Sequence, residues 1–167
     1  MSIHIIVAIS ENNVIGKNGE LPWHIPEDLQ RFKRLTMNHV VLMGHKTWAS
    51  IPQKYRPLPG RKNVVLSREE SYVVPTGVQH FSSLESALNA HEDETVFIIG
   101  GGEIYRQTIA LADKMYVTRI HKEIEGTVFF PVIDSTKWKE IEREDHDVYS
   151  FVTLERLSDQ IHLPFSS

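Results

Sequence analysis

The 167-residue sequence contains no cysteine. This absence excludes disulfide bonds, thiolate metal sites and a cysteine nucleophile, and it suits a protein of the cytoplasm. The sequence also lacks any run of 18 or more apolar residues, so no membrane span is expected. Its apolar start, MSIHIIVAIS, has neither the basic segment nor the cleavage site of a signal peptide. We therefore expect a cytoplasmic protein that does not bind membranes.

Positive charge and metal-binding patterns are scarce as well. The formal net charge is −4 and the isoelectric point is near 6.1, which argues against nucleic acid as a partner. The nine histidines form no H-E-x-x-H motif, and no G-x-S-x-G elbow is present, so neither a metal site nor a serine hydrolase is expected. The acidic stretch Glu144–Asp147 is predicted to be a solvated turn.

Short runs rich in Ile and Val alternate with helical patterns. Runs of this length without polar alternation are typical of strands covered on both faces, at Ile3–Ile9, Val40–Met43, Asn63–Leu66 and Val96–Ile99. Helices are predicted at Pro26–Thr36, Lys46–Ser50, Ser83–Ala90 and Glu103–Ala110. The pattern predicts one α/β domain over residues 1–167, with a parallel sheet and helices on both faces. Near the end, Lys114–Ile120 and Tyr149–Leu157 are predicted to be antiparallel edge strands.

Two predicted strands run directly into glycine and then into a helix. Gly44 follows the first of them, and Gly100, Gly101 and Gly102 follow the second. Glycine lets the backbone turn sharply and approach a ligand closely, so two such turns suit the phosphates of a nucleotide. Neither matches the Rossmann or P-loop motif, and a single turn of this kind is equally well explained as ordinary turn chemistry.

The stretch GKNGELPWHIPEDLQRFKRLT carries a second signal. Leu29, Phe32 and Leu35 form the apolar stripe of the predicted helix, and Asp28 borders the same stripe. Glu27 falls away from the stripe and is explained by the helix dipole alone, and Arg31 falls away from it too. A carboxylate beside an aromatic ring in a partly apolar cleft suits a flat, donor-rich heterocycle, although a role in the helix dipole is also possible for Asp28.

Six segments then occur in the order of one known family. They are VAISENNVIGKNGELPWHIPEDLQRFKRLT, VVLMGHKTWASIP, PLPGRKNVVLS, VFIIGGGEIY, MYVTRI and EGTVFFP. Together they resemble a bacterial dihydrofolate reductase from about Ile3 to Leu157, with residues 158–167 as a tail outside the resemblance. The resemblance implies an eight-stranded, mostly parallel sheet with an antiparallel C-terminal edge. It also implies NADPH-dependent reduction of 7,8-dihydrofolate to tetrahydrofolate, inhibition by antifolates and a monomer.

The resemblance also assigns roles to residues. Asp28, with Thr118 as its hydroxyl partner, matches the residue that binds the pterin, and Trp23 and Leu21 complete the catalytic group. Arg61 matches the arginine that binds the α-carboxylate of the glutamate tail, as its planar fork of donors allows. The walls of the folate cleft match Ile6, Ala8, Leu29, Phe32, Ile51, Leu58 and Ile99. The NADPH site matches Ala8, Ile15, Gly16, Asn18, Leu21, Gly44, His45, Lys46, Thr47, Leu66, Ser67, Arg68, Ile99, Gly101, Gly102, Glu103, Ile104, Tyr105 and Gln107.

The chain departs from the family pattern near the cofactor. His45 and Glu103 stand where the best-known bacterial enzyme has arginines, so contact with the 2′-phosphate is expected to fall mainly to Arg68, with Lys46 or protonated His45. Thr127 replaces an acid that helps to hold a loop, Asn18–Trp23, closed over the nicotinamide. Two alternatives remain at this point: a pyrimidinone reductase of riboflavin synthesis, which would lack the set Asp28, Phe32 and Arg61, and a nucleotide-binding module without catalysis.

Overall fold

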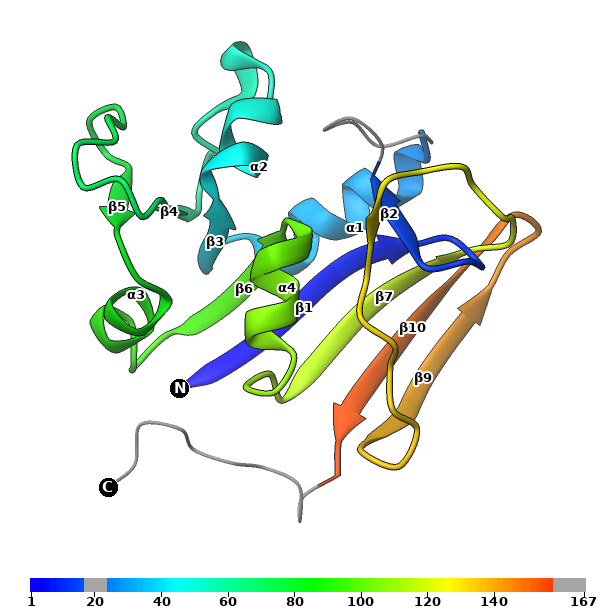
Figure 1. Ribbon diagram of the computed structural model, residues 1–167. Helices are drawn as coiled ribbons and strands as arrows, with labels where there is room; N and C mark the ends of the chain where they lie inside the picture. The colour runs from blue at the N-terminus through cyan, green and yellow to red at the C-terminus, as the bar shows by residue number, and fades with distance from the viewer. Residues whose placement is uncertain (17–23, 158–167) are drawn as a thin grey trace.

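The computed structural model describes residues 1–16 and 24–157 (Figure 1). Its strands are β1 (Ser2–Ile9), β2 (Val14–Gly16), β3 (Val40–Gly44), β4 (Lys62–Leu66), β5 (Gln79–Phe81), β6 (Thr95–Gly100), β7 (Lys114–Ile120), β8 (Val128–Phe129), β9 (Trp138–Asp145) and β10 (Tyr149–Arg156). Its helices are α1 (Pro26–Thr36), α2 (His45–Ser50), α3 (Leu84–Ala90) and α4 (Gly102–Thr108), with a 3-10 turn at Gln53–Tyr55. The four predicted helices are confirmed to within two residues at each end.

One sheet of eight strands organises the described residues, in the order β5-β4-β3-β6-β1-β7-β10-β9. The strands from β5 to β7 in this order are parallel, and β10 is antiparallel to both of its neighbours. The short strands β2 and β8 form a separate antiparallel pair. The expected mostly parallel, eight-stranded sheet is thus confirmed.

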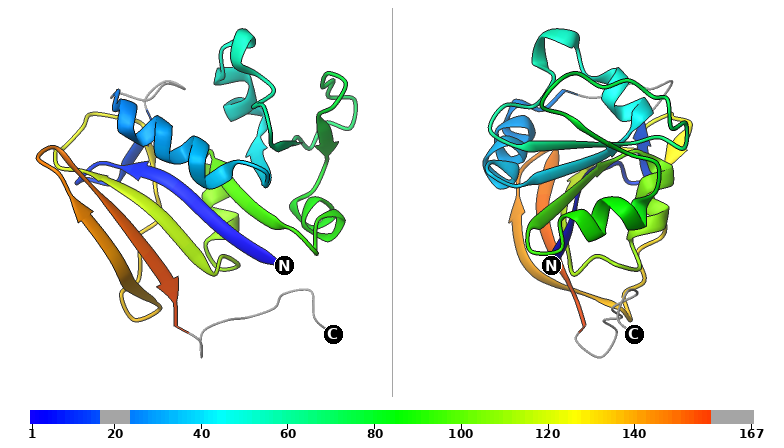
Figure 2. Two further views of the ribbon diagram at one scale, coloured as in Figure 1. Left: turned by 180° about the vertical axis from the view of Figure 1, so that it is seen from behind. Right: turned by 90° about the vertical axis from the view of Figure 1, so that its left-hand side faces the viewer.

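Helices cover both faces of this sheet, as the alternation of strand and helix predicts. Figure 2 shows α1 on one face and α3 and α4 on the other. Along β1, Ile5 and Ile9 join the core beneath α3 and α4, whereas Ile6 joins the core beneath α1. Successive side chains of a strand point to opposite faces, so a strand buried on both faces has a continuous apolar sequence. This arrangement explains why the sequences of β1, β3, β4 and β6 are short, mostly apolar runs without regular polar alternation.

The antiparallel end of the sheet differs from the prediction. Neither Lys114–Ile120 nor Tyr149–Leu157 is an edge strand, because β7 lies between β1 and β10, and β10 lies between β7 and β9. The true edge is β9, whose residues after Trp138 are all exposed. Charged side chains are the usual protection of an edge strand against pairing with another chain, and they hide the strand from a search for apolar periodicity. The predicted acidic turn Glu144–Asp147 therefore begins within β9, and only its second half lies between the strands.

The adjacent parallel strands β3 and β6 bring the two glycine turns together. Met43 pairs with Gly100, so both strands end at the same level of the sheet. The helices that follow them, α2 and α4, begin at His45 and Gly102. Ligands of open α/β sheets bind at the carboxyl ends of the strands, so this edge of the sheet is where a site is expected.

Candidate active site

Helix α1 places Asp28 directly over the sheet. The helix begins with Pro26 at its first position, which suits the fixed backbone angle of proline. Thr118 on β7 donates its hydroxyl hydrogen to Asp28, with Oγ1 2.5 Å from Oδ1. Thr118 is only 2% exposed, and it pairs in register with Ala8 of β1. Helix and sheet are therefore joined by a short bond to a carboxylate, at the two residues predicted to bind the pterin.

The environment of this carboxyl group changes its acidity. Burial raises the pKa of Asp28 above its ordinary value of 3.8, while the hydrogen bond from Thr118 and the charge of Arg31 lower it. The raising effect is the largest, since a buried carboxylate loses its hydration. The charge of Asp28 in turn adds to the burial that raises the pKa of Tyr105, whose hydroxyl donates to the Ile6 carbonyl oxygen at 2.8 Å.

The glycine turns leave room that side chains would fill. A Cβ atom on Gly101 would lie 3.3 Å from Thr47 Oγ1, which shows how closely the turns after β3 and β6 approach. A Cβ atom on Gly102 would lie 2.7 Å from Val128 Cγ1, closer than packing allows. Gly100 has a φ of 128°, a conformation that side chains rarely adopt. A side chain would therefore be strained at Gly100, would clash with Val128 at Gly102 and would crowd Thr47 at Gly101.

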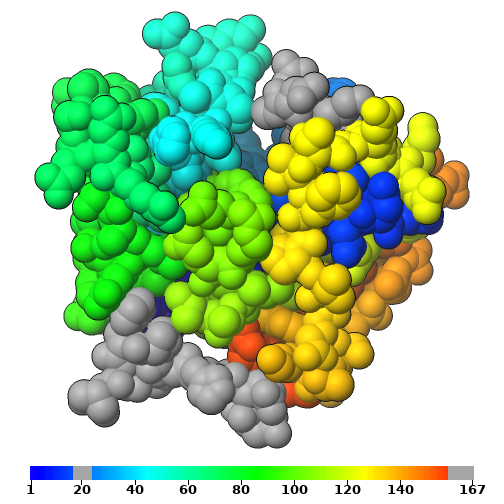
Figure 3. All heavy atoms as spheres, viewed as in Figure 1, coloured from blue at the N-terminus to red at the C-terminus, as the bar shows by residue number. Residues whose placement is uncertain are grey.

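A long cleft joins these features. Its volume is about 2180 Å³, well above the 300–1,000 Å³ of a typical pocket for one small molecule. Figure 3 shows the surface hollowed between the cyan segment around α2 and the yellow segment around β8. Every predicted site residue within the described ranges lines this cleft except Thr118, which lies beneath Asp28. Asn18, Leu21 and Trp23 lie outside the described residues.

Charged groups line the cleft beyond both ends of β4, because Arg61 directly precedes this strand and Arg68 follows it. At one end, Arg61 is half-buried and donates to the Pro59 carbonyl oxygen at 2.9 Å and to Thr36 Oγ1 at 3.3 Å. At the other end, Arg68 and Glu103 form an ion pair, with Nη2 and Oε1 3.0 Å apart. These side chains are 87% and 59% exposed, respectively, so the pair is accessible to a ligand.

The helical pattern gave a wrong location for Arg31, which was expected to lie away from the apolar stripe. It is half-buried, and its guanidinium carbon lies 4.6 Å from the ring centre of Phe151 and 5.6 Å from that of Tyr116. Leu29, assigned to the apolar stripe, is 54% exposed and lines the cleft instead. The spacing of three residues between Asp28 and Arg31 places them on neighbouring parts of one helix face, which is the signal that could have identified Arg31.

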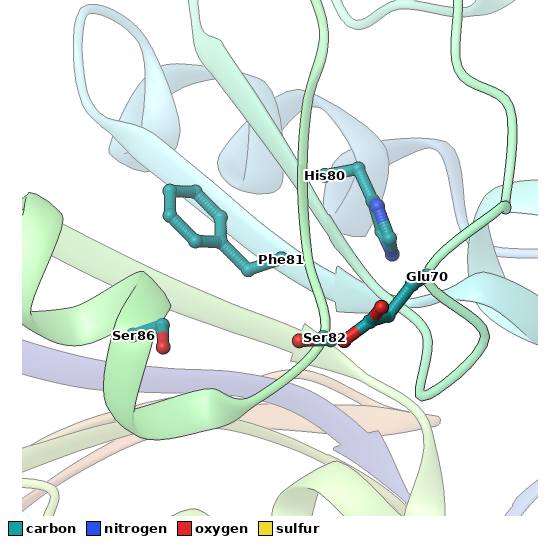
Figure 4. A pocket seen from close by; sticks show the side chains of 5 residues that line it. All are labelled: Glu70, His80, Phe81, Ser82 and Ser86. Carbon is teal, nitrogen blue, oxygen red and sulfur yellow. The ribbon is translucent and has the colours of Figure 1, made fainter.

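A second, smaller hollow of about 260 Å³ lies beside β5 (Figure 4). Figure 4 shows His80 and Phe81 on opposite sides of the chain, with Ser86 on the same side as Phe81. Glu70 and Ser82 complete the lining of this hollow. His80 Nε2 already contacts the Ser67 carbonyl oxygen at 3.0 Å. Within residues 1–16 and 24–157 there is no cluster of acids and histidines that could hold a metal ion, and no helix with the length and apolar character of a membrane span.

Comparison with known proteins gives a consistent result. The family model described as dihydrofolate reductase matches residues 2–156. The chain is 45% identical over 152 residues to a dihydrofolate reductase of Neisseria meningitidis serogroup A, covering 90% of this chain and 91% of that protein. It is 42% identical over 164 residues to a type 3 dihydrofolate reductase of Salmonella typhimurium, covering 93% and 99%. A solved dihydrofolate reductase from Enterococcus faecalis, complexed with NADP(H) and RAB-propyl, superposes with a TM-score of 0.84 at 32% identity, covering 93% and 96%.

The raised pKa of Asp28 has a consequence for stability. Because the folded protein holds this proton more tightly than the unfolded chain, the contribution of the carboxyl group is complete below about pH 3.8 and is lost as pH rises through the folded-state pKa. Asp28→Asn keeps an acceptor for Thr118 and removes the buried charge. We expect it to raise the free energy of unfolding by about 1–2 kcal/mol at pH 8 and by less at pH 4. Urea denaturation at the two pH values measures this difference, and an equal effect at both would contradict it.

Proposed function

The chain belongs to the dihydrofolate reductase family, and on that premise we propose how its cleft reduces 7,8-dihydrofolate to tetrahydrofolate with NADPH. The observation that carries the proposal is the bond between Asp28 and Thr118 at the wall of a cleft large enough for two ligands. An ionised carboxylate accepts hydrogen bonds from the N3–H and 2-amino groups of a pterin. Phe32 lines the cleft on the same helix, so the flat ring would lie against an aromatic side chain.

The residues around the glycine turns fit NADPH. The absence of side chains at Gly101 and Gly102 leaves a cradle beside Thr47 and Val128, where a Cβ would crowd its neighbours. Ser67 and Arg68, beyond the end of β4, supply a hydroxyl group and a cation for an anionic group at the far end of the cleft. When bound, the cofactor supplies the hydride that reduces C6 of the pterin.

The protein supplies orientation, charge and shelter from water. We infer that Asp28 anchors the pterin and stabilises positive charge on it, while water carries the proton to N5. Arg61 would bind the α-carboxylate of the glutamate tail, because its guanidinium lies at the opposite end of the cleft from Arg68 and forms only part of its possible hydrogen bonds within the described residues. Protonated diaminopyrimidines would bind at Asp28 by the same pairing.

The activity is tested by following NADPH absorbance with dihydrofolate present and then omitted. We expect oxidation only when dihydrofolate is present. Asp28→Asn should lower turnover at neutral pH by about 10²-fold or more while the protein stays folded, since an acid–base group contributes on this scale. Near-normal turnover in the folded variant would contradict the role given to Asp28. Cofactor oxidation without dihydrofolate would contradict the assigned substrate.

The placement of the glutamate tail is tested by removing Arg61. Arg61→Leu should weaken dihydrofolate binding by about 2–5 kcal/mol, as is typical when one partner of a desolvated charge pair is lost. The matched control is Lys62→Leu, because Lys62 is exposed, bonds to Glu94 and does not line the cleft. Equilibrium titration with dihydrofolate measures the dissociation constants of both variants. Equal dissociation constants would contradict the binding of the glutamate tail by Arg61.

Cofactor preference is tested at the other end. The carboxylate of Glu103 is paired with the guanidinium of Arg68, so a 2′-phosphate must displace this carboxylate to bind Arg68. Glu103→Gln should tighten NADPH binding by about threefold to tenfold and leave NADH binding unchanged, a size typical of one exposed charge. Glu70→Gln, which removes an acid not paired with Arg68, is the control. Tryptophan fluorescence measures the dissociation constants, and equal tightening of NADPH and NADH would contradict the assignment.

A further inference from the structure

Helix α1 carries a cation, Arg31, close to Asp28, the carboxylate proposed to bind the pterin. Arg31 follows Asp28 by three residues on the helix, so the two side chains lie over neighbouring parts of the sheet. Asp28 lies over Thr118 of β7. Arg31 lies over Phe151 of β10, which pairs in register with Thr118. Directly opposed residues of an antiparallel pair share one face, so the carboxylate and the guanidinium are next to each other.

Two aromatic rings fix the position of the Arg31 guanidinium. Its guanidinium carbon is 4.6 Å from the Phe151 ring centre and 5.6 Å from the Tyr116 ring centre. A guanidinium over an aromatic face is attracted by the ring, and the planar group also stacks well. Arginine remains charged even when it is partly buried. The rings therefore hold a permanent positive charge beside Asp28.

We propose that Arg31 is a positioning residue for the reaction, whose stacked guanidinium keeps the Asp28 carboxylate ionised and available to the pterin. The effect of Arg31 on the reaction rests on the proposed function, whereas its effect on the charge of Asp28 does not. The charge of Arg31 is one of the two causes that lower the pKa of Asp28 against the effect of burial, the other being the Thr118 hydrogen bond. Thr118 lowers the pKa of Asp28 through a hydrogen bond, whereas Arg31 lowers it through the electrostatic effect of its charge.

Other ionisable groups interact electrostatically with this pair, from both faces of the sheet. In addition to burial, the charge of Asp28 contributes to the raised pKa values of Tyr105 on α4 and Tyr149 on β10, and the charge of Glu27 also raises the pKa of Tyr149. The charged or ionisable neighbours of Arg31 are Arg34 on α1, Tyr116 on β7 and Glu142 on β9. Among them, Arg34 carries the same charge on the same helix and is exposed, whereas Arg31 is half-buried and is the cation that lowers the pKa of Asp28. Arg34 is therefore a suitable control.

The proposal is tested by titrating the Asp28 carboxyl carbon by NMR in the ligand-free protein, with Asp28→Asn identifying the resonance. Arg31→Met keeps an unbranched side chain over the rings and removes the charge. We expect it to raise the proton affinity of Asp28 about threefold to tenfold. Arg31→Lys, which keeps the charge, and Arg34→Met should each change it by less than about twofold. An unchanged affinity in Arg31→Met, or an equal rise in Arg31→Lys, would overturn the proposal.

A kinetic measurement separates this proposal from the proposed function. If ionised Asp28 binds the pterin, KM for dihydrofolate in Arg31→Met should begin to rise at a higher pH than in the wild type as the pH is lowered. The KM profile of Arg34→Met should match that of the wild type. A wild-type protein without dihydrofolate reduction would contradict the proposed function, while the carboxyl titration would still report on Arg31. A KM profile unchanged in Arg31→Met would contradict the role of Arg31 alone.

Discussion

A carboxylate held against the middle of a sheet is the constraint on which the site depends. Asp28 loses hydration where it lies, and burial raises its pKa more than its neighbours lower it. The Thr118 hydroxyl meets the carboxylate because α1 lies across β7, which is an internal strand between β1 and β10. The position of the helix, the order of the strands and the chemistry of the site are thus linked through one 2.5 Å bond.

The parallel part of the sheet provides the rest of the cleft. Because β3 and β6 are adjacent and end together, the glycine turns that follow them approach within contact of each other. The hydroxyl of Tyr105 bonds to the Ile6 carbonyl oxygen and connects α4 to β1, beside the strand that carries Thr118. A ligand between the turns and a ligand at Asp28 would therefore share the wall formed by β1, which is the arrangement that transfer between two bound molecules requires.

Sequence alone predicted the parts of this structure that depend on local pattern. The four strands buried on both faces have short runs rich in Ile and Val, and helical spacing distinguished Asp28 from Glu27. The sequence pattern did not reveal β9, because a strand whose side chains are mostly in solvent has no apolar periodicity. It also misplaced Arg31, because the aromatic rings that attract this side chain come from β7 and β10, far away in the chain. Periodicity describes which face of a helix is buried, but not whether the opposing surface suits a cation.

Two pairs of opposite charges, one lining the cleft and one at its wall, show how burial affects the strength of an electrostatic interaction. Arg68 and Glu103 are in direct contact but mostly exposed, so water and salt screen their attraction and an incoming anion with greater charge can replace the carboxylate. Asp28 and Arg31 are not joined by a hydrogen bond within the described residues, yet they lie where hydration is reduced, so the field of one reaches the other with less screening. The exposed pair is therefore suited to exchanging its carboxylate for an anionic ligand, whereas the partly buried pair keeps a fixed positive charge beside Asp28. The difference follows from the fold, because Arg68 and Glu103 extend from a loop and a helix end, whereas Asp28 and Arg31 lie between α1 and the sheet.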